Sequence, residues 1–119
     1  MSTRTITITI QNDTGNILYL ENENLEHGKW INEPVQNIGT GASCVIKAGN
    51  RDGALIGTTG KFTYKNQDGM CMVSFDKPYG SSKTVVEHNA SGPYDSKLEN
   101  DNLQHHDSSC TIAFYKTTK

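Results

Sequence analysis

The amino-acid sequence predicts an all-β fold, an antiparallel β-sandwich of about 8–10 short strands in a single domain that spans residues 1–119. Thr, Asn, Gly and Ser together supply 44 of the 119 residues, a mixture that disfavours long helices and favours strands joined by tight turns. Turn-forming residues recur about every 8–12 residues, and no segment has the period of an amphipathic helix. A chain of this length can build one small core.

The clearest strand lies at residues 5–10, where threonine and isoleucine alternate strictly. Successive side chains of a strand point to opposite faces, so we expect the three isoleucines to share one face of a sheet. Residues 12–15, Asn-Asp-Thr-Gly, favour a turn, and apolar residues resume at 16–21. These two strands are predicted to form a hairpin.

The middle of the chain contains three predicted strands, at residues 43–47, 61–65 and 70–75. The last two are separated by Asn-Gln-Asp-Gly at 66–69, whose Asp-Gly pair suits a hairpin. Residues 21–29 are the nearest candidate for a helix, but they carry a single aliphatic anchor and cannot bury a face. We therefore expect a loop there.

Further strands are predicted towards the C-terminus, at residues 83–88, 94–99 and 109–116. In the last of these, every second residue from Cys110 to Phe114 is apolar, so these side chains should lie on one side.

The three cysteines, Cys44, Cys71 and Cys110, cannot all pair with one another within one chain, and their spacing matches no metal-ligand motif. We expect buried, reduced thiols rather than a disulfide framework. No metal site and no cofactor are predicted.

The charged residues make nucleic acid an unexpected partner. Lys and Arg number 11 against 13 Asp and Glu, the net charge is −2, and no basic run is present to follow a phosphate backbone. The first residues lack the apolar stretch of a signal peptide, and no apolar run approaches about 18 residues. The sequence therefore predicts synthesis in the cytoplasm.

No catalytic constellation stands out, so an enzyme is not expected. Residues 105–107, His-His-Asp, point to opposite faces of a strand and have no second group at zinc spacing, which favours a solvated tip. Asp-Gly pairs at 52–53 and 68–69 are interpreted as turns rather than calcium loops. Ser81 and Ser82 lack the Gly-x-Ser-x-Gly pattern of a hydrolase nucleophile.

Aromatic residues with nearby lysines are the candidate binding residues. Trp30 is the only tryptophan and follows Lys29 in a polar setting, where it suits either a membrane interface or a half-buried packing position. Tyr79 lies between proline and glycine, which predicts an exposed turn, and Phe75 and Lys77 precede it. The lysines suit anionic headgroups, although scattered lysines are more often solubilising.

Two ordered motifs resemble the aegerolysin family of small β-sandwich proteins. Residues 48–62 contain Gly-Asn-Arg-Asp-Gly followed by Gly-Thr-Thr-Gly at the entry to a strand, and residues 74–81 read Ser-Phe-Asp-Lys-Pro-Tyr-Gly-Ser. Residues 8–15, 18–21 and 28–30 are similar to the small component of bacterial binary insecticidal crystal toxins. The resemblance covers nearly the whole chain.

The resemblance implies a non-enzymatic toxin component that engages a membrane lipid or receptor and cooperates with a larger β-rich partner protein to permeabilise target membranes. It places Phe75 and Tyr79 in aromatic positions of the family. The implied mechanism is that the folded domain docks on the membrane through loops that bear Trp30 and Tyr79. Storage in crystal inclusions, or release and action outside the producing cell, is implied as well. The alternative is a soluble lectin-like module without membrane activity, because Asn, Asp and Thr also suit sugar hydroxyls.

Overall fold

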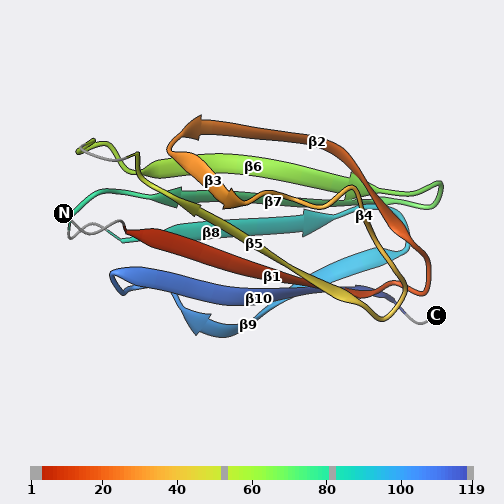
Figure 1. Cartoon of the computed structure of the whole chain (residues 1–119). Helices are drawn as coiled ribbons and strands as arrows, with labels where there is room; N and C mark the ends of the chain where they lie inside the picture. Colours follow the sequence, from red (N-terminus) through yellow and green to blue (C-terminus); the bar gives the residue numbers. More distant parts are fainter. Residues whose placement is uncertain (1–3, 52–53, 81–82, 118–119) are drawn as a thin grey trace.

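A computed structural model of the protein describes residues 4–51, 54–80 and 83–117, which form two five-stranded sheets packed face to face (Figure 1). The first sheet contains, in spatial order, β3 (Lys29–Asn32), β5 (Ser43–Gly49), β1 (Thr5–Asp13), β10 (Asp107–Lys116) and β9 (Tyr94–Asn102). The second contains β4 (Asn37–Ile38), β2 (Leu18–His27), β6 (Thr58–Lys65), β7 (Met70–Lys77) and β8 (Val85–Ala90). All neighbouring strands are antiparallel except β1 and β10, which are parallel. The predicted all-β sandwich is confirmed.

The core between the sheets follows the alternation seen in the sequence. Ile6, Ile8 and Ile10 are at most 1% exposed, and they face the gap between the sheets together with Cys110 and Phe114. Aromatic side chains of β6 fill the same layer from the other sheet. The predicted sidedness of the first and last strands is therefore confirmed.

The expected hairpin between residues 5–10 and 16–21 is wrong, because β1 and β2 lie in different sheets. The connection crosses from one sheet to the other and is fixed by the buried Asn12 side chain, whose Nδ2 donates to the carbonyl oxygens of Asn16 at 2.8 Å and Ile38 at 2.9 Å. Alternation identifies a strand and its buried face but does not identify its neighbours. The hairpin predicted around residues 66–69 is confirmed as β6 and β7.

The loop expected at residues 21–29 is also wrong, because β2 continues to His27. This segment pairs with β6, with Asn24 opposite Lys61, and its polar side chains are exposed to solvent. Leu25 packs against the core from the inner side. Backbone pairing with a neighbouring strand thus supports this segment with little apolar burial of its own.

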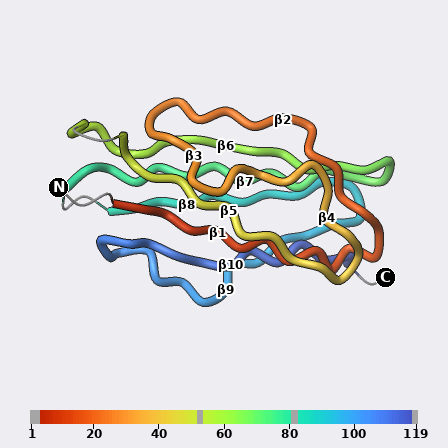
Figure 2. The backbone as a smooth tube through the Cα atoms, in the orientation of Figure 1, coloured from red at the N-terminus to blue at the C-terminus, as the bar shows by residue number. Residues whose placement is uncertain are grey.

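The connections gather at the two ends of an elongated molecule with extents of 48 × 23 × 19 Å (Figure 2). One end holds Arg4, Gly28 and the described residues of three connections, 50–51 with 54–57, 78–80 with 83–84, and 103–106, because the strands that they join are in register there. Gly28, with φ of 106°, turns the chain from β2 into β3, which is part of the other sheet. None of the described residues belongs to a helix that is long and apolar enough to cross a membrane.

Candidate functional site

Positive charge gathers at the end of the sandwich that contains Arg4. Five of the 11 lysines and arginines lie there, and we call this part of the molecule the basic end; its cationic residues are Arg4, Lys29, Arg51, Lys83 and the buried Lys77. Carboxylates lie at the same end, Glu26, Asp76 and Asp107 among them, so the charge of these cations is partly offset. A local excess of one sign attracts oppositely charged surfaces.

Carboxylates near the basic end are engaged by neighbouring hydroxyl groups. Asp76 accepts a hydrogen bond from Thr59 Oγ1 at 2.9 Å, and Asp107 accepts one from Thr5 Oγ1 at 2.8 Å. The Thr5 hydroxyl is the main reason why the pKa of Asp107 lies below its ordinary value. His106 also approaches Asp107, with Nδ1 at 3.4 Å from Oδ1. The Asp107 side chain is nevertheless 68% exposed, so these hydrogen bonds do not remove its negative charge from the surface.

Two exposed aliphatic side chains project from the connection between β5 and β6. Leu55 is 70% exposed and Ile56 is 59% exposed, the highest values among the large hydrophobic residues that the structure describes. The start of this connection is fixed, because Asn50 Oδ1 accepts from the Arg4 amide at 2.8 Å and Arg51 Nε donates to the Gly28 carbonyl at 3.4 Å. Adjacent exposed aliphatic residues on a loop are typical of a contact surface.

The sequence prediction missed Leu55 and Ile56. The sequence signal for their exposure was an apolar pair between Gly53 and Gly57. Apolar residues in a turn flanked by glycines belong to no strand and so have no buried face. The predicted Asp-Gly turn at 52–53 and the residues Ser81 and Ser82 lie outside the described residues.

Trp30 lies in β3, not in a loop, and is half-buried. Its ring meets that of Phe75 edge to face, with centroids 6.1 Å apart, and its Nε1 donates to Glu23 Oε1 at 3.0 Å. Because β3 and β7 belong to different sheets, this contact closes the sandwich behind the basic end. Of the two interpretations of Trp30, the packing position matches this geometry, and its contact with a membrane stays a prediction.

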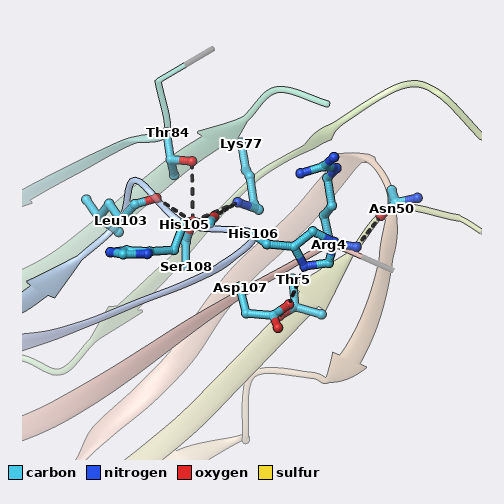
Figure 3. Close-up of polar contacts among 10 residues, drawn as sticks. All are labelled: Arg4, Thr5, Asn50, Lys77, Thr84, Leu103, His105, His106, Asp107 and Ser108. Carbon is cyan, nitrogen blue, oxygen red and sulfur yellow. Dashed lines mark hydrogen bonds and ion pairs between the residues drawn. The ribbon is translucent and has the colours of Figure 1, made fainter. Parts of the chain in front are cut away.

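Phe75 and Lys77 are buried, at 3% and 5% exposed respectively, because both side chains point from β7 towards the other sheet. Lys77 Nζ donates to the His105 carbonyl at 2.8 Å and to Ser108 Oγ at 2.7 Å (Figure 3). Burial lowers the pKa of Lys77, and the nearby Arg4 charge lowers it further, while Asp107 opposes both. Phe75 and Lys77 thus support the end from within, and a direct contact with a membrane would require the sheets to open.

Tyr79 and Lys29, two of the candidate binding residues, lie at the basic end. Their contact with a membrane stays a prediction. The Tyr79 ring is half-buried and faces the Arg4 guanidinium, whose carbon is 5.0 Å from the ring centroid. Lys29 begins β3 opposite Gly49. The fold therefore brings Lys29, Lys77 and Tyr79 to one end and places Trp30 and Phe75 in the packing behind it.

Other predictions about reactive groups concern His105, His106, Asp107 and the cysteines. Residues 105–107 are exposed between β9 and the start of β10, so the solvated tip is confirmed. Within residues 4–51, 54–80 and 83–117, no group of three or more His, Cys, Asp or Glu side chains is placed to hold a metal ion. The three cysteines are free and buried as predicted, and burial raises the pKa of Cys71 to about 12 and that of Cys110 to about 11.

The fold and these residues define a small two-sheet sandwich protein whose candidate site is an end of the sandwich with clustered cations and exposed aliphatic side chains. The chain belongs to the aegerolysin family, whose family model matches residues 3–113. No curated protein sequence matches the chain at a significant level.

Three solved structures are similar to the chain at low sequence identity. The RahU protein in complex with a TRIS molecule is 16% identical, with a TM-score of 0.85, and the match covers 98% of this chain and 97% of RahU. The lipid binding protein Nakanori is 12% identical, with a TM-score of 0.79 and coverage of 99% and 73%. IP-1A from Alcaligenes faecalis is 18% identical, with a TM-score of 0.75 and coverage of 97% and 92%. At these identities the likeness establishes the shared fold.

Proposed function

We propose that this protein is a non-enzymatic, membrane-binding toxin component that docks on target membranes through its basic end. Membership of the aegerolysin family and the likeness to a protein described as lipid binding support this proposal. The proposal includes a larger β-rich partner protein that permeabilises the membrane, an insecticidal target, and synthesis in the cytoplasm followed by action outside the producing cell.

The observation that carries the proposal is the combination of cations with exposed aliphatic side chains on one end. Leu55 and Ile56 supply apolar surface for the boundary between headgroups and acyl chains, as exposed residues of membrane-surface proteins do. Arg51 lies in the same connection and Lys83 in the connection between β7 and β8; both are exposed and suit anionic headgroups. Each such cation adds about 1 kcal/mol of attraction close to an anionic membrane surface.

The buried contacts behind the end suit a domain that docks without unfolding. Lys77 joins β7 to the connection between β9 and β10, and the Trp30–Phe75 contact joins the two sheets. A surface that is held in place before binding loses little conformational entropy when it binds. Tyr79, held by Arg4, contributes an amphipathic ring at headgroup depth.

Membrane binding is tested by co-sedimentation with vesicles of phosphatidylcholine, with and without phosphatidylserine. We expect phosphatidylserine to increase binding and the double variant Arg51→Ser and Lys83→Ser to lose most of that increase. Lys116→Ser is the matched control, because Lys116 is an exposed cation near the opposite end. Equal binding by both variants, or no binding by the parent protein to either vesicle, would overturn docking through the basic end.

The partner is tested by dye release from vesicles that the parent protein binds. We expect weak release by this protein alone and strong release when it is mixed with a larger β-rich protein encoded by a neighbouring gene. Equally strong release without that protein would contradict the division of labour, and so would the absence of any such neighbouring gene.

A further inference from the structure

The outer face of the sheet formed by β2, β6, β7 and β8 carries a long groove on the side of the sandwich, lined by polar and apolar side chains. Two adjoining depressions share Lys61, Ser74 and Glu87, so together they form one continuous hollow along the strands. The central strands form its floor, where Ser74 and Met72 are half-buried, and the exposed residues of β2 and β8 form its sides.

Strand register arranges the polar side chains of this groove in rows. Asn24, Lys61, Ser74 and Glu87 lie opposite one another on four successive strands. Asn22, Thr63, Met72 and Asn89 form the next row. Strands rise about 3.4 Å per residue and side chains of one face recur every second residue, so successive rows are about 7 Å apart.

The four side chains of the first row are not engaged by the protein. Asn24, Lys61, Ser74 and Glu87 make no side-chain hydrogen bond or ion pair with any residue that the structure describes. Beyond the groove on the same face, Lys65 and Glu21 do form an ion pair at 2.8 Å. Amide, hydroxyl, carboxylate and ammonium groups therefore remain available for a ligand.

The chemistry of the groove favours a neutral sugar chain. Sugar hydroxyls both donate and accept hydrogen bonds, and this row offers both functions. Three carboxylates line the groove, from Glu26, Asp76 and Glu87, against one cation, Lys61, which disfavours anionic ligands.

We propose that this groove binds the oligosaccharide headgroup of a neutral glycolipid. The row with Thr59, Asp76 and Val85 lies next to the basic end. When that end is docked on a membrane, the groove therefore opens towards the membrane surface. The inference thus rests on the proposed function. A headgroup that projects from the membrane runs along the groove, while the basic end contacts the surrounding lipids.

The test compares vesicles of phosphatidylcholine and phosphatidylserine that contain no glycolipid with vesicles that contain one neutral glycolipid. The neutral set carries terminal glucose, galactose, mannose or N-acetylglucosamine, and a sialylated form of the galactose glycolipid completes the panel. We expect at least one neutral glycolipid to increase binding about tenfold, through a few hydrogen bonds to groups that are otherwise unpaired. The free oligosaccharide should compete for that increase.

Variants separate the groove from the docking end. Ser74→Arg fills the floor and should abolish the increase, and the exposed pair Asn24→Ala and Glu87→Ala should reduce it without endangering the fold. Thr9→Arg is the matched control, since Thr9 is a half-buried outward residue on a central strand of the other sheet. Circular dichroism confirms that each variant is folded.

The inference is overturned if no neutral glycolipid increases binding, if the increase survives in a folded Ser74→Arg variant, or if the sialylated glycolipid is preferred. It is also overturned if the asparagine and glutamate pair leaves the increase unchanged. Absence of binding to glycolipid-free vesicles would instead overturn docking through the basic end. If the free oligosaccharide still bound the protein in that case, sugar binding by the groove would be supported.

Discussion

Replacing Leu55 and Ile56 together with serine tests the apolar part of the basic end. The side chains are 70% and 59% exposed, which amounts to about 1.3 side chains of this size in contact with water. Transfer of one such side chain out of water is worth about 1.5–3 kcal/mol, so the lower limit gives about 2 kcal/mol for the pair. Since about 1.4 kcal/mol corresponds to tenfold, we expect the membrane partition coefficient to fall about 30-fold.

The assay is flotation with phosphatidylcholine and phosphatidylserine vesicles over a range of lipid concentrations, followed by the same measurement at high salt. Salt screens the contribution of the cations, so the apolar contribution should dominate the remaining binding. Val45→Ser is the matched control, because Val45 is 47% exposed on β5, away from the end. Both changes affect exposed residues, and the free energy of unfolding should change by no more than about 0.5 kcal/mol. A double variant that partitions like the parent protein at both salt concentrations would refute the role of this loop.

Three further predictions concern the interior. Trp30→Ala removes a half-buried ring that closes the sandwich, so the free energy of unfolding, measured with urea, should fall by about 2 kcal/mol, and an unchanged value would mean that the ring is dispensable. Burial lowers the pKa of Lys77, so the folded protein holds this proton less tightly than the unfolded chain, and stability gains from this group as pH rises towards 10.5. Lys77→Met should remove that part of the pH profile of unfolding, and an unaltered slope would contradict the assignment. The three buried thiols should resist a thiol reagent at about pH 8 until denaturant is added, and labelling of the folded protein would contradict their burial.

The sequence revealed strands and their buried faces more readily than the partners of those strands. The alternating isoleucines of β1 identified a core face because the side-chain period of a strand is two. No local pattern indicated that β1 pairs with β5 and β10, since pairing across a sandwich is decided by packing between distant segments. The segment after Glu21 was missed as a strand because its support comes from β6.

The sequence singled out residues that the fold brings to one end, but it did not indicate which of their side chains are buried. Lys77 precedes proline and tyrosine, which locally indicates an exposed turn, yet its side chain is buried because Ser108, 31 positions away, accepts its hydrogen bond. Trp30 has polar neighbours in sequence and an aromatic neighbour, Phe75, only in space. The Leu55 and Ile56 pair was visible in the sequence, but its exposure depended on the conformation of the connection that carries it.

The parallel pairing of β1 with β10 has a consequence for how the molecule is made. Thr5 and Asp107 bond across a separation of 102 positions, and β1 occupies the centre of its sheet between β5 and β10. That position stays vacant on one side until β10 has been synthesised, so folding is expected to be slow, as in other proteins dominated by distant contacts. A nascent chain therefore exposes the isoleucine face of β1 until β10 is available, and low temperature or chaperones should raise the yield of soluble protein.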